Sequence, residues 1–512
     1  MAGDLLLGID VGTYSSKGVV CTSSGEVVAS ATVEHGLSLP RPGWAEQDAD
    51  AVWWADTVHL CRTLLHDSIQ PDQIAAVAVS AIGPCMLPVD QQGHPLRPAV
   101  LYGIDTRATE EIDWLNQTFG KETLYQFDGM GLTSQAIGPK ILWLRRHEPD
   151  VYAQTAKILS ASSYLVLRLT GETVLDRHSA SYFNPLIDIH TLAWDDRFAK
   201  PIIELSRLPR LLWANEIAGQ VTRAASAETG LPIGTPVTAG TIDAAAEAIS
   251  VGVQDPGDLM VMYGTTMFFL LVTGELASDP RLWSTAYCFP GLYDITAGMA
   301  TSGALTRWFR DEFAPLERNV EGNGGVPAYA ALSALAAEIP AGANGLICLP
   351  YFSGERTPIN DPLARGVFAG LTLSHTRAHL YRSLLEGTAY GVRHNIDAMR
   401  QLGVPPRRLV AVGGGAKNRL WLQIVSDVTG LPQVVPVQTI GASFGDAFLA
   451  GLATGLIPDR AAGQASWVSI RETIEPRLQH RATYDDYYAV YRSLYEHSRS
   501  DLHTLAHLGE RS

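Results

Sequence analysis

Short apolar runs alternate with segments of helical periodicity along most of the chain. Residues 74–80 and 409–412 are apolar and bounded by polar or glycine residues, as is typical of buried strands. Residues 376–403 instead repeat apolar positions at helical spacing, and Thr376 is suited to cap the start of that helix. This alternation of strands and helices predicts an α/β fold.

Two distant stretches share one pattern of strand, Gly-Thr turn and strand. Residues 5–20 read LLLGIDVGTYSSKGVV, and residues 258–273 read DLMVMYGTTMFFLLVT. If the two stretches belong to similar halves of the protein, each half would present its turn to a shared cleft and bind a polyphosphate from one side. The alternative is that the two hairpins are unrelated. We therefore expect an N-terminal domain over residues 1–250 and a C-terminal domain over 251–512, with a mostly helical extension from about 456.

Composition and charge narrow the class of protein. The 512 residues are 46% hydrophobic and 18% charged, which permits large buried cores. A net charge of −15 without a basic cluster argues against a nucleic-acid partner. Five scattered cysteines suit reduced thiols, and neither a signal peptide nor a membrane span is evident. We expect a soluble, cytoplasmic protein with no membrane partner; its oligomeric state is open, a homodimer included.

The first Gly-Thr turn, DVGTYSSK, gathers groups that suit a phosphate. Gly12 permits a backbone shape in which N–H groups point at an anion. Thr13 and Ser15 add hydroxyls, and Lys17 adds a positive charge. Asp10 ends an apolar strand and is placed to hold Mg²⁺ through water, because magnesium keeps much of its hydration shell. A plain hairpin is the alternative.

Two later segments carry further candidate chemistry. Asp243 follows a short strand and opens an alanine-rich helix. Taken alone it is best explained as a helix cap, although a carboxylate there would also accept the proton of a substrate hydroxyl in phosphoryl transfer. Three glycines at 413–415 lie between a strand and a helix, where the backbone can approach a flat ligand. Asn418 is within reach of an adenine or ribose edge.

Taken together, these segments resemble the FGGY family of carbohydrate kinases. The segments that carry the resemblance are the first turn, GWAEQD at 43–48, the Asp243 segment, YGTT at 263–266 with SGA at 302–304, GERTP at 354–358, GVFAGL at 366–371, and the stretch 413–418. The resemblance implies two actin-like (ribonuclease H-like) ATPase domains with an ATP cleft between them. It also implies ATP- and Mg²⁺-dependent phosphorylation of a hydroxyl of a small sugar or polyol, of the xylulokinase-like pentulose type.

The resemblance also implies roles for individual residues. Asp243 would be the catalytic base, and Asp10 would lie beside the metal. The nucleotide would be bound by Gly12, Thr13, Ser15, Lys17, Gly264, Thr265, Gly303, Gly414 and Asn418. The acceptor would meet Asp105, Arg107 and Gln135 besides Asp243. For the Asp-x-Arg pair, a surface ion pair that opens a helix is an equally good explanation.

The chain departs from the family where the sugar would bind. Xylulose kinases resembling it usually carry Met-His, and glycerol kinases Arg-Glu, where this chain has Gly83-Pro84. Ala244 follows Asp243 where those kinases have Asn or Gln. Neither substrate can therefore be assumed, and we expect D-xylulose to be at best a modest substrate. A kinase for a tetritol, a sugar acid or a signalling sugar is the first alternative, and a nucleotide-switched sugar sensor on the same fold is the second.

Overall fold

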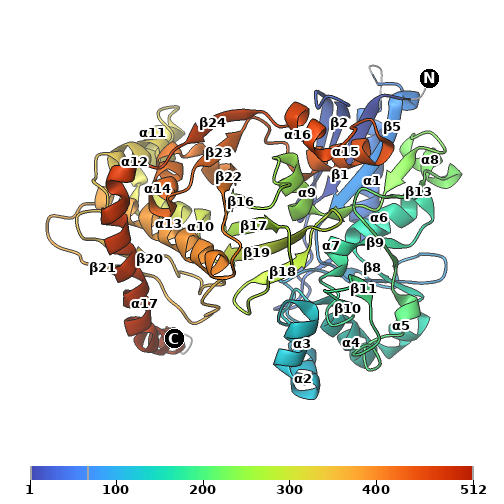
Figure 1. Ribbon diagram of the computed structural model, residues 1–512, viewed down its shortest axis with the longest axis horizontal. Coiled ribbons are helices and arrows are strands. Elements are labelled where there is room, and N and C mark those ends of the chain that lie inside the picture. Colours follow the sequence, from blue (N-terminus) through green and yellow to red (C-terminus); the bar gives the residue numbers. More distant parts are fainter. Residues whose placement is uncertain (1–2, 66–68, 510–512) are drawn as a thin grey trace. The chain divides into compact units, whose positions relative to one another are not determined.

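A computed structural model describes residues 3–65 and 69–509, which form two units of mixed α/β structure (Figure 1). Unit 1 consists of Met1–Gln254, Thr273–Asp294 and Ile440–Ser469, and unit 2 of Asp255–Val272, Ile295–Thr439 and Ile470–Ser512. Two segments beyond residue 254 thus group with the N-terminal part of the chain. The sequence-based boundary near residue 250 stays a prediction.

A mixed sheet forms the centre of unit 1. Its central strand β1 (Leu5–Val11) pairs antiparallel with β2 (Ser15–Thr22) and parallel with β5 (Ile74–Ala81). The order is β13 (Ile217–Gln220), β14 (Pro236–Thr238), β5, β1, β2 and β3 (Val27–Glu34), and β15 (Thr241–Ile242) also pairs with β5. Every residue of β1 is buried because helices cover both faces of the sheet, which explains its almost uniformly apolar sequence.

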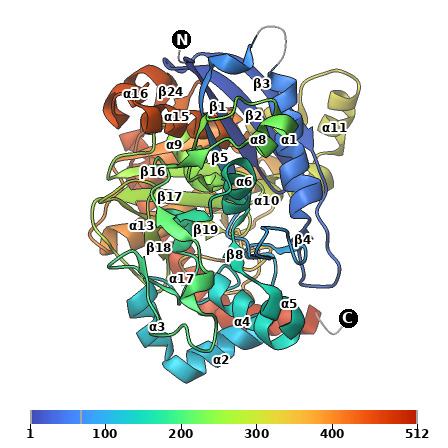
Figure 2. The same ribbon diagram turned by 90° about the vertical axis from the view of Figure 1, so that its right-hand side faces the viewer.

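Two glycines set how closely these helices approach. Helix α15 (Ala442–Thr454) lies on β1 at Gly8, where a Cβ atom would be only 1.9 Å from the carbonyl oxygen of Ser443. On the opposite face, Gly18 makes room for Leu64 of α1 (Ala55–Leu64). Side chains alternate along a strand, so Asp10, two residues after Gly8, faces α15. Figure 2 shows α15 beside β1, and the alternation of side chains therefore places Asp10 on the α15 side of the sheet.

Unit 2 repeats the arrangement of β1, β2 and β5. Strand β16 (Asp258–Tyr263) pairs antiparallel with β17 (Met267–Thr273) and parallel with β22 (Arg408–Val412). Its sheet continues from β22 to β23 (Gln433–Pro436) and β24 (Ile470–Ile474), and β19 (Tyr293–Met299) flanks β17. Both predicted hairpins are present, and the predicted α/β class is confirmed.

Long helices pack around the unit 2 sheet. Helix α13 (Arg377–Gln401) begins after Thr376, as predicted, and contacts α14 (Arg419–Thr429). The last helix, α17 (Arg481–Gly509), packs against both. In the described part of the chain, no helix combines the length and apolarity that crossing a bilayer requires. All five cysteines are buried free thiols, which confirms the expectation drawn from their spacing.

Candidate functional site

Buried and partly exposed carboxylates converge in unit 1 where β1, β5 and β15 end. Asp10 lies beside Ser80 of β5 in the strand register. The Ser80 hydroxyl oxygen is 2.7 Å from Asp446 Oδ2 and 3.2 Å from Asp10 Oδ1, so its single hydrogen is shared between two carboxylates. Asp243 is the first residue of α9 (Asp243–Ser250), and Glu247 follows it one helical turn later. Four carboxylates therefore belong to one region of unit 1.

Burial and mutual repulsion disfavour the ionised forms of these groups. Burial raises the pKa of Asp10 well above its ordinary value, and the charges of Asp243 and Glu247 raise it further. Burial raises the pKa of Asp243 to about 7, although the Ala244 N–H, 2.7 Å from Asp243 Oδ1, opposes the rise. Burial likewise raises the pKa of Asp446. A bound cation would relieve this repulsion.

The first Gly-Thr turn connects β1 to β2 beside these carboxylates. The Gly12 N–H donates to the Ser15 carbonyl oxygen at 3.0 Å, so this amide closes the turn and does not point at an anion. The Thr13 hydroxyl lies 3.3 Å from the Tyr102 hydroxyl. Lys17 stands opposite Asp10 in the strand register and lowers the pKa of Asp10. The turn therefore offers hydroxyls and a positive charge next to Asp10.

Unit 2 contains a cavity of ≈ 880 Å³, large enough for a nucleoside. It brings together the predicted residues of the second Gly-Thr turn, the start of α10 (Gly303–Phe313) and the glycine-rich turn. These lining residues are Gly264, Thr265, Gly303, Gly414 and Asn418. The lining also includes aromatic and cationic side chains, among them Tyr329, Tyr381, Arg307 and Lys417. The cavity has aromatic and cationic groups for a base and a phosphate.

The glycines around this cavity have different roles. A Cβ atom at Gly303 would lie 2.4 Å from the Gly264 carbonyl oxygen, which accepts the Gly303 N–H at 2.9 Å. Gly413 has φ +87°, a conformation that favours glycine. Gly414 differs because a Cβ atom there would meet nothing within 4 Å. Gly303 and Gly413 are thus required by the fold, whereas Gly414 faces open space at the cavity.

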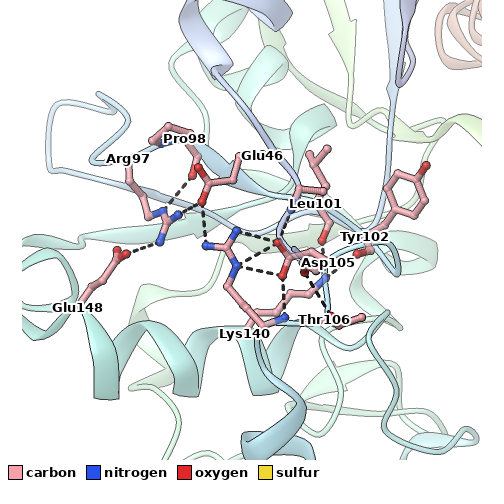
Figure 3. Close-up of polar contacts among 12 residues, drawn as sticks. Glu46, Arg97, Pro98, Leu101, Tyr102, Asp105, Thr106, Lys140 and Glu148 are labelled. Carbon is pink, nitrogen blue, oxygen red and sulfur yellow. Dashed lines mark hydrogen bonds and ion pairs between the residues drawn. The ribbon is translucent and has the colours of Figure 1, made fainter. Parts of the chain in front are cut away.

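Asp105 and Arg107 form part of a buried ionic cluster in unit 1 (Figure 3). Arg107 Nη2 is 2.7 Å from Asp105 Oδ2, and Arg107 Nη1 is 2.8 Å from Glu46 Oε1. Neither side chain of the Asp105–Arg107 pair is exposed at all, so the surface ion pair considered as an alternative is excluded. The Arg107 guanidinium also lies 3.9 Å above the Trp44 ring. Substrate contact by either residue stays a prediction.

Two further segments adjoin this cluster and Asp243. Gln135 Oε1 accepts the Gly103 N–H at 3.0 Å, which places the predicted substrate residue beside the turn that leads to Asp105. Gly83 is so close to Ile242 that a Cβ atom would lie 2.7 Å from its Cγ1 atom. The segment that departs from the family therefore lies next to the residue before Asp243.

Several residues of the site were not found from the sequence. Glu247 had a usable signal, because it lies one helical turn after Asp243. No pattern in the sequence marked Ser80, Tyr102 or Lys140. Asp446 was missed as well, because it lies 366 positions from its partner Ser80. In the ranges that the structure covers, no three or more His, Cys, Asp or Glu side chains are grouped to hold a metal. A metal at Asp10 would therefore take most of its ligands from water or phosphate.

Comparison with known proteins gives a consistent result. Models of the N-terminal and C-terminal domains of the FGGY family of carbohydrate kinases match residues 5–250 and 259–454. A xylulose kinase from Escherichia coli (strain K12) is 31% identical over 96% of this chain and 99% of its own length. A glycerol kinase from Nocardia farcinica is also 31% identical, over 93% of this chain and 95% of its own. The crystal structure of xylulose kinase from Rhodospirillum rubrum superposes with a TM-score of 0.90 at 33% identity, covering 98% of this chain and all of that one.

Proposed function

The chain belongs to the FGGY family of carbohydrate kinases, and on this basis we propose that it transfers the γ-phosphoryl group of ATP to a hydroxyl of a pentulose. The fold is the two-domain actin-like ATPase fold of that family, and the activity is that of an ATP-dependent sugar kinase. We place the protein in the cytoplasm, where ATP is available. The observation that carries the proposal is the position of Asp243, which is partly exposed and opens α9 directly after β15, the strand that pairs with β5 at Ser80. Its pKa of about 7 also suits proton transfer near neutral pH.

Asp243 acts in this proposal as the base for the acceptor hydroxyl. As the hydroxyl oxygen attacks the γ-phosphorus, its proton passes to a carboxylate oxygen of Asp243, and the bond from the γ-phosphorus to the bridging oxygen of ADP breaks. The transition state of such transfers is loose, so the base mainly orients the hydroxyl. Lys17 and the Thr13 hydroxyl supply positive charge and a donor for the phosphate oxygens.

Mg²⁺ fits the residues present in unit 1. Asp10 carries a buried carboxylate whose ionised form is disfavoured, and Asp446 Oδ1 is buried without a hydrogen-bond partner. Asp10 is the residue that would hold the ion, through water as well as directly. When bound, the ion would neutralise charge on the phosphate oxygens. Asp446 would act at a distance, through the Ser80 hydroxyl that it shares with Asp10.

The unit 2 cavity is the proposed adenosine site. Its volume suits a nucleoside, and Gly414 leaves room for a flat base against the backbone. Asn418 Oδ1 accepts the Trp421 N–H at 3.2 Å and so caps α14. Its side-chain amide nitrogen is the group that would donate to the base or ribose. Thr265 is exposed at the second Gly-Thr turn, where its hydroxyl would meet a phosphate.

The identity of the acceptor sugar is inferred from the relatives of this chain, and the positions at which the chain differs from the family pattern limit how far that inference goes. Xylulose kinases from Escherichia coli (strain K12), Bacillus subtilis (strain 168) and Rhodospirillum rubrum are similar to this chain over nearly its whole length, which puts D-xylulose first among candidates. The glycerol kinase of equal identity shows that overall similarity does not select the acceptor. Gly83-Pro84 and Ala244 depart from the residues that the family resemblance implies at these positions. We therefore infer a pentulose, with D-xylulose and D-ribulose to be distinguished by measurement.

One kinetic panel tests this assignment. Purified protein is assayed for ADP release with pentuloses, glycerol, tetritols, sugar acids and hexoses, and Asp243→Asn serves as the background control. We expect a pentulose to give the highest kcat/KM, at least about tenfold above glycerol, the scale of one lost hydrogen bond. If a tetritol or a sugar acid were the best acceptor, the pentulose assignment would be refuted, but the assignment of kinase activity would stand. Absence of acceptor-dependent ADP release would refute the kinase itself.

A further inference from the structure

The turn at residues 101–105 connects two parts of the candidate site. The hydroxyl of Tyr102 is 3.3 Å from Thr13 Oγ1 in the first Gly-Thr turn. Burial raises the pKa of Tyr102, and the charge of Asp243 raises it further. Three residues later, Asp105 enters the buried ionic cluster. Tyr102 thus links the first Gly-Thr turn to the segment that enters the buried ionic cluster.

Lys140 of α4 (Ile137–His147) holds this turn from inside the protein. Its ammonium nitrogen donates to the carbonyl oxygens of Leu101 and, at 3.0 Å, of Tyr102 (Figure 3). The side chain is only 1% exposed. Through the ranges 3–65 and 69–509, no carboxylate forms an ion pair with Lys140. Its recorded partners are therefore two neutral carbonyls.

Keeping an ammonium buried without a carboxylate partner is unfavourable for the fold. Burial lowers the pKa of Lys140 to about 8, and the charge of Asp105 only partly opposes this. A methionine would fill similar volume without the cost of removing a charge from water. The structure therefore keeps Lys140 at a cost in stability, which points to a role for its two hydrogen bonds in the site.

Other hydrogen bonds also restrain the turn: the Leu101 N–H donates to the Ala45 carbonyl oxygen at 3.1 Å, and the Asp105 N–H donates to the Tyr102 carbonyl oxygen at 3.0 Å. Gly103 is fixed at both backbone groups, since its N–H donates to Gln135 Oε1 at 3.0 Å and its carbonyl oxygen accepts from Ser134 Oγ at 2.9 Å. Asp105 is fixed by the Ala45 N–H at 2.7 Å. The Tyr102 carbonyl is thus shared between Lys140 and the Asp105 N–H, whereas the Leu101 carbonyl accepts from Lys140. The Leu101 carbonyl belongs to the peptide that leads into Tyr102, so Lys140 orients the backbone from which the Tyr102 side chain projects.

We propose that Lys140 is a positioning residue for phosphoryl transfer, which holds the Tyr102 hydroxyl beside Thr13 of the first Gly-Thr turn so that it contacts the acceptor sugar. This inference rests on the proposed function and adds a specificity contact to it. A phenol hydroxyl both donates and accepts, so it suits a polyhydroxylated acceptor. Tyr102 makes the contact, and Lys140 acts through Tyr102.

A double-mutant cycle tests the coupling between the two residues. Wild type, Tyr102→Phe, Lys140→Met and the double variant are compared in steady state with the best acceptor from the panel. We expect each single variant to lower kcat/KM for the acceptor about tenfold, the scale of one lost hydrogen bond. The double variant should have a kcat/KM no lower than that of the less active single variant, because both changes remove the same contact. Calorimetry should show weaker acceptor binding, with affinity for a non-hydrolysable ATP analogue within about threefold of wild type.

Lys157 provides a matched control. Its ammonium also donates to two carbonyls, those of Ser206 at 2.8 Å and Leu208 at 3.0 Å, but its carbonyl partners lie outside the 101–105 turn. Lys157→Met should keep wild-type kinetics. Additive losses in the cycle, or wild-type kcat/KM in Lys140→Met, would overturn the proposal. Failure of both Lys140→Met and Lys140→Gln to fold would assign Lys140 to the fold alone. A wild-type protein inactive on every acceptor would instead overturn the proposed function, and this inference with it.

Discussion

Replacing Asp243 with asparagine removes the proposed proton acceptor and leaves the local bonding intact. Asp243 Oδ1 accepts the Ala244 N–H at 2.7 Å, a bond that an asparagine carbonyl retains. Loss of a positioned base is expected to slow turnover by about 10²–10⁴-fold, equivalent to about 3–5 kcal/mol of transition-state stabilisation. Coupled detection of ADP at saturating ATP and acceptor measures this loss directly.

The pKa of Asp243 adds a pH dependence with opposite signs for activity and stability. Burial raises this pKa to about 7, and only the ionised form accepts a proton, so wild-type kcat/KM should rise about tenfold from pH 6 to pH 8. The folded protein binds this proton more tightly than the unfolded chain does. Ionisation therefore costs stability as the pH rises through 7, by at most ~4 kcal/mol for a rise from 3.8 to about 7. Asp243→Asn lacks that cost and should be more stable than wild type at pH 8.

A second aspartate at a helix start distinguishes the base from a structural role. Asp459 caps α16 (Arg460–Trp467) by accepting the Ala462 N–H at 2.8 Å. Asp459→Asn should leave turnover and its pH profile unchanged, since asparagine caps a helix nearly as well. Near-normal turnover in Asp243→Asn, or a profile between pH 6 and pH 8 that it shares with wild type, would refute the reasoning and reduce Asp243 to a residue of the helix start.

Other substitutions test the remaining parts of the site. Gly414→Val and Thr265→Val should each weaken binding of a non-hydrolysable ATP analogue by about tenfold in calorimetry, whereas Gly322→Val, where a Cβ atom also meets open space, should not; equal affinities would remove the proposed adenosine site. Asp10→Asn should raise the Mg²⁺ concentration that restores half of the activity after treatment with EDTA, and an unchanged requirement would exclude Asp10 from the metal site. Arg107→Met should lower the free energy of unfolding in urea by about 3–5 kcal/mol because it leaves its carboxylate partner buried and unpaired, and a loss below about 1 kcal/mol would contradict the buried cluster.

The features that the sequence predicted well depend on local chemistry. The two hairpins at 5–20 and 258–273 require only alternating strand residues around a Gly-Thr turn, and both form. The glycine-rich turn at 413–415 joins a strand to a helix as expected, because three glycines suit neither element. Periodicity and turn residues were therefore enough to identify the fold class and most of the segments that line the cavity.

The features that could not be predicted from the sequence depend on contacts between distant segments of the chain. The Asp-x-Arg pattern at 105–107 gave no sign that both side chains would be buried, because Glu46 and Trp44 come from another part of unit 1. The pattern around Gly12 suggested a free amide for an anion, whereas the Ser15 carbonyl occupies it. Tertiary packing decides both outcomes, and no local signal encodes it.

The central claim is that this chain moves the γ-phosphoryl group of ATP onto a hydroxyl of a pentulose. ³¹P nuclear magnetic resonance of a reaction with ATP, Mg²⁺ and D-xylulose or D-ribulose tests it most directly. We predict that the γ-phosphate signal of ATP is replaced in equal amount by the phosphomonoester signal of a sugar phosphate, and that Asp243→Asn abolishes the change. Conversion of the γ-phosphate signal to inorganic phosphate alone, or no conversion with any pentulose, would contradict the account.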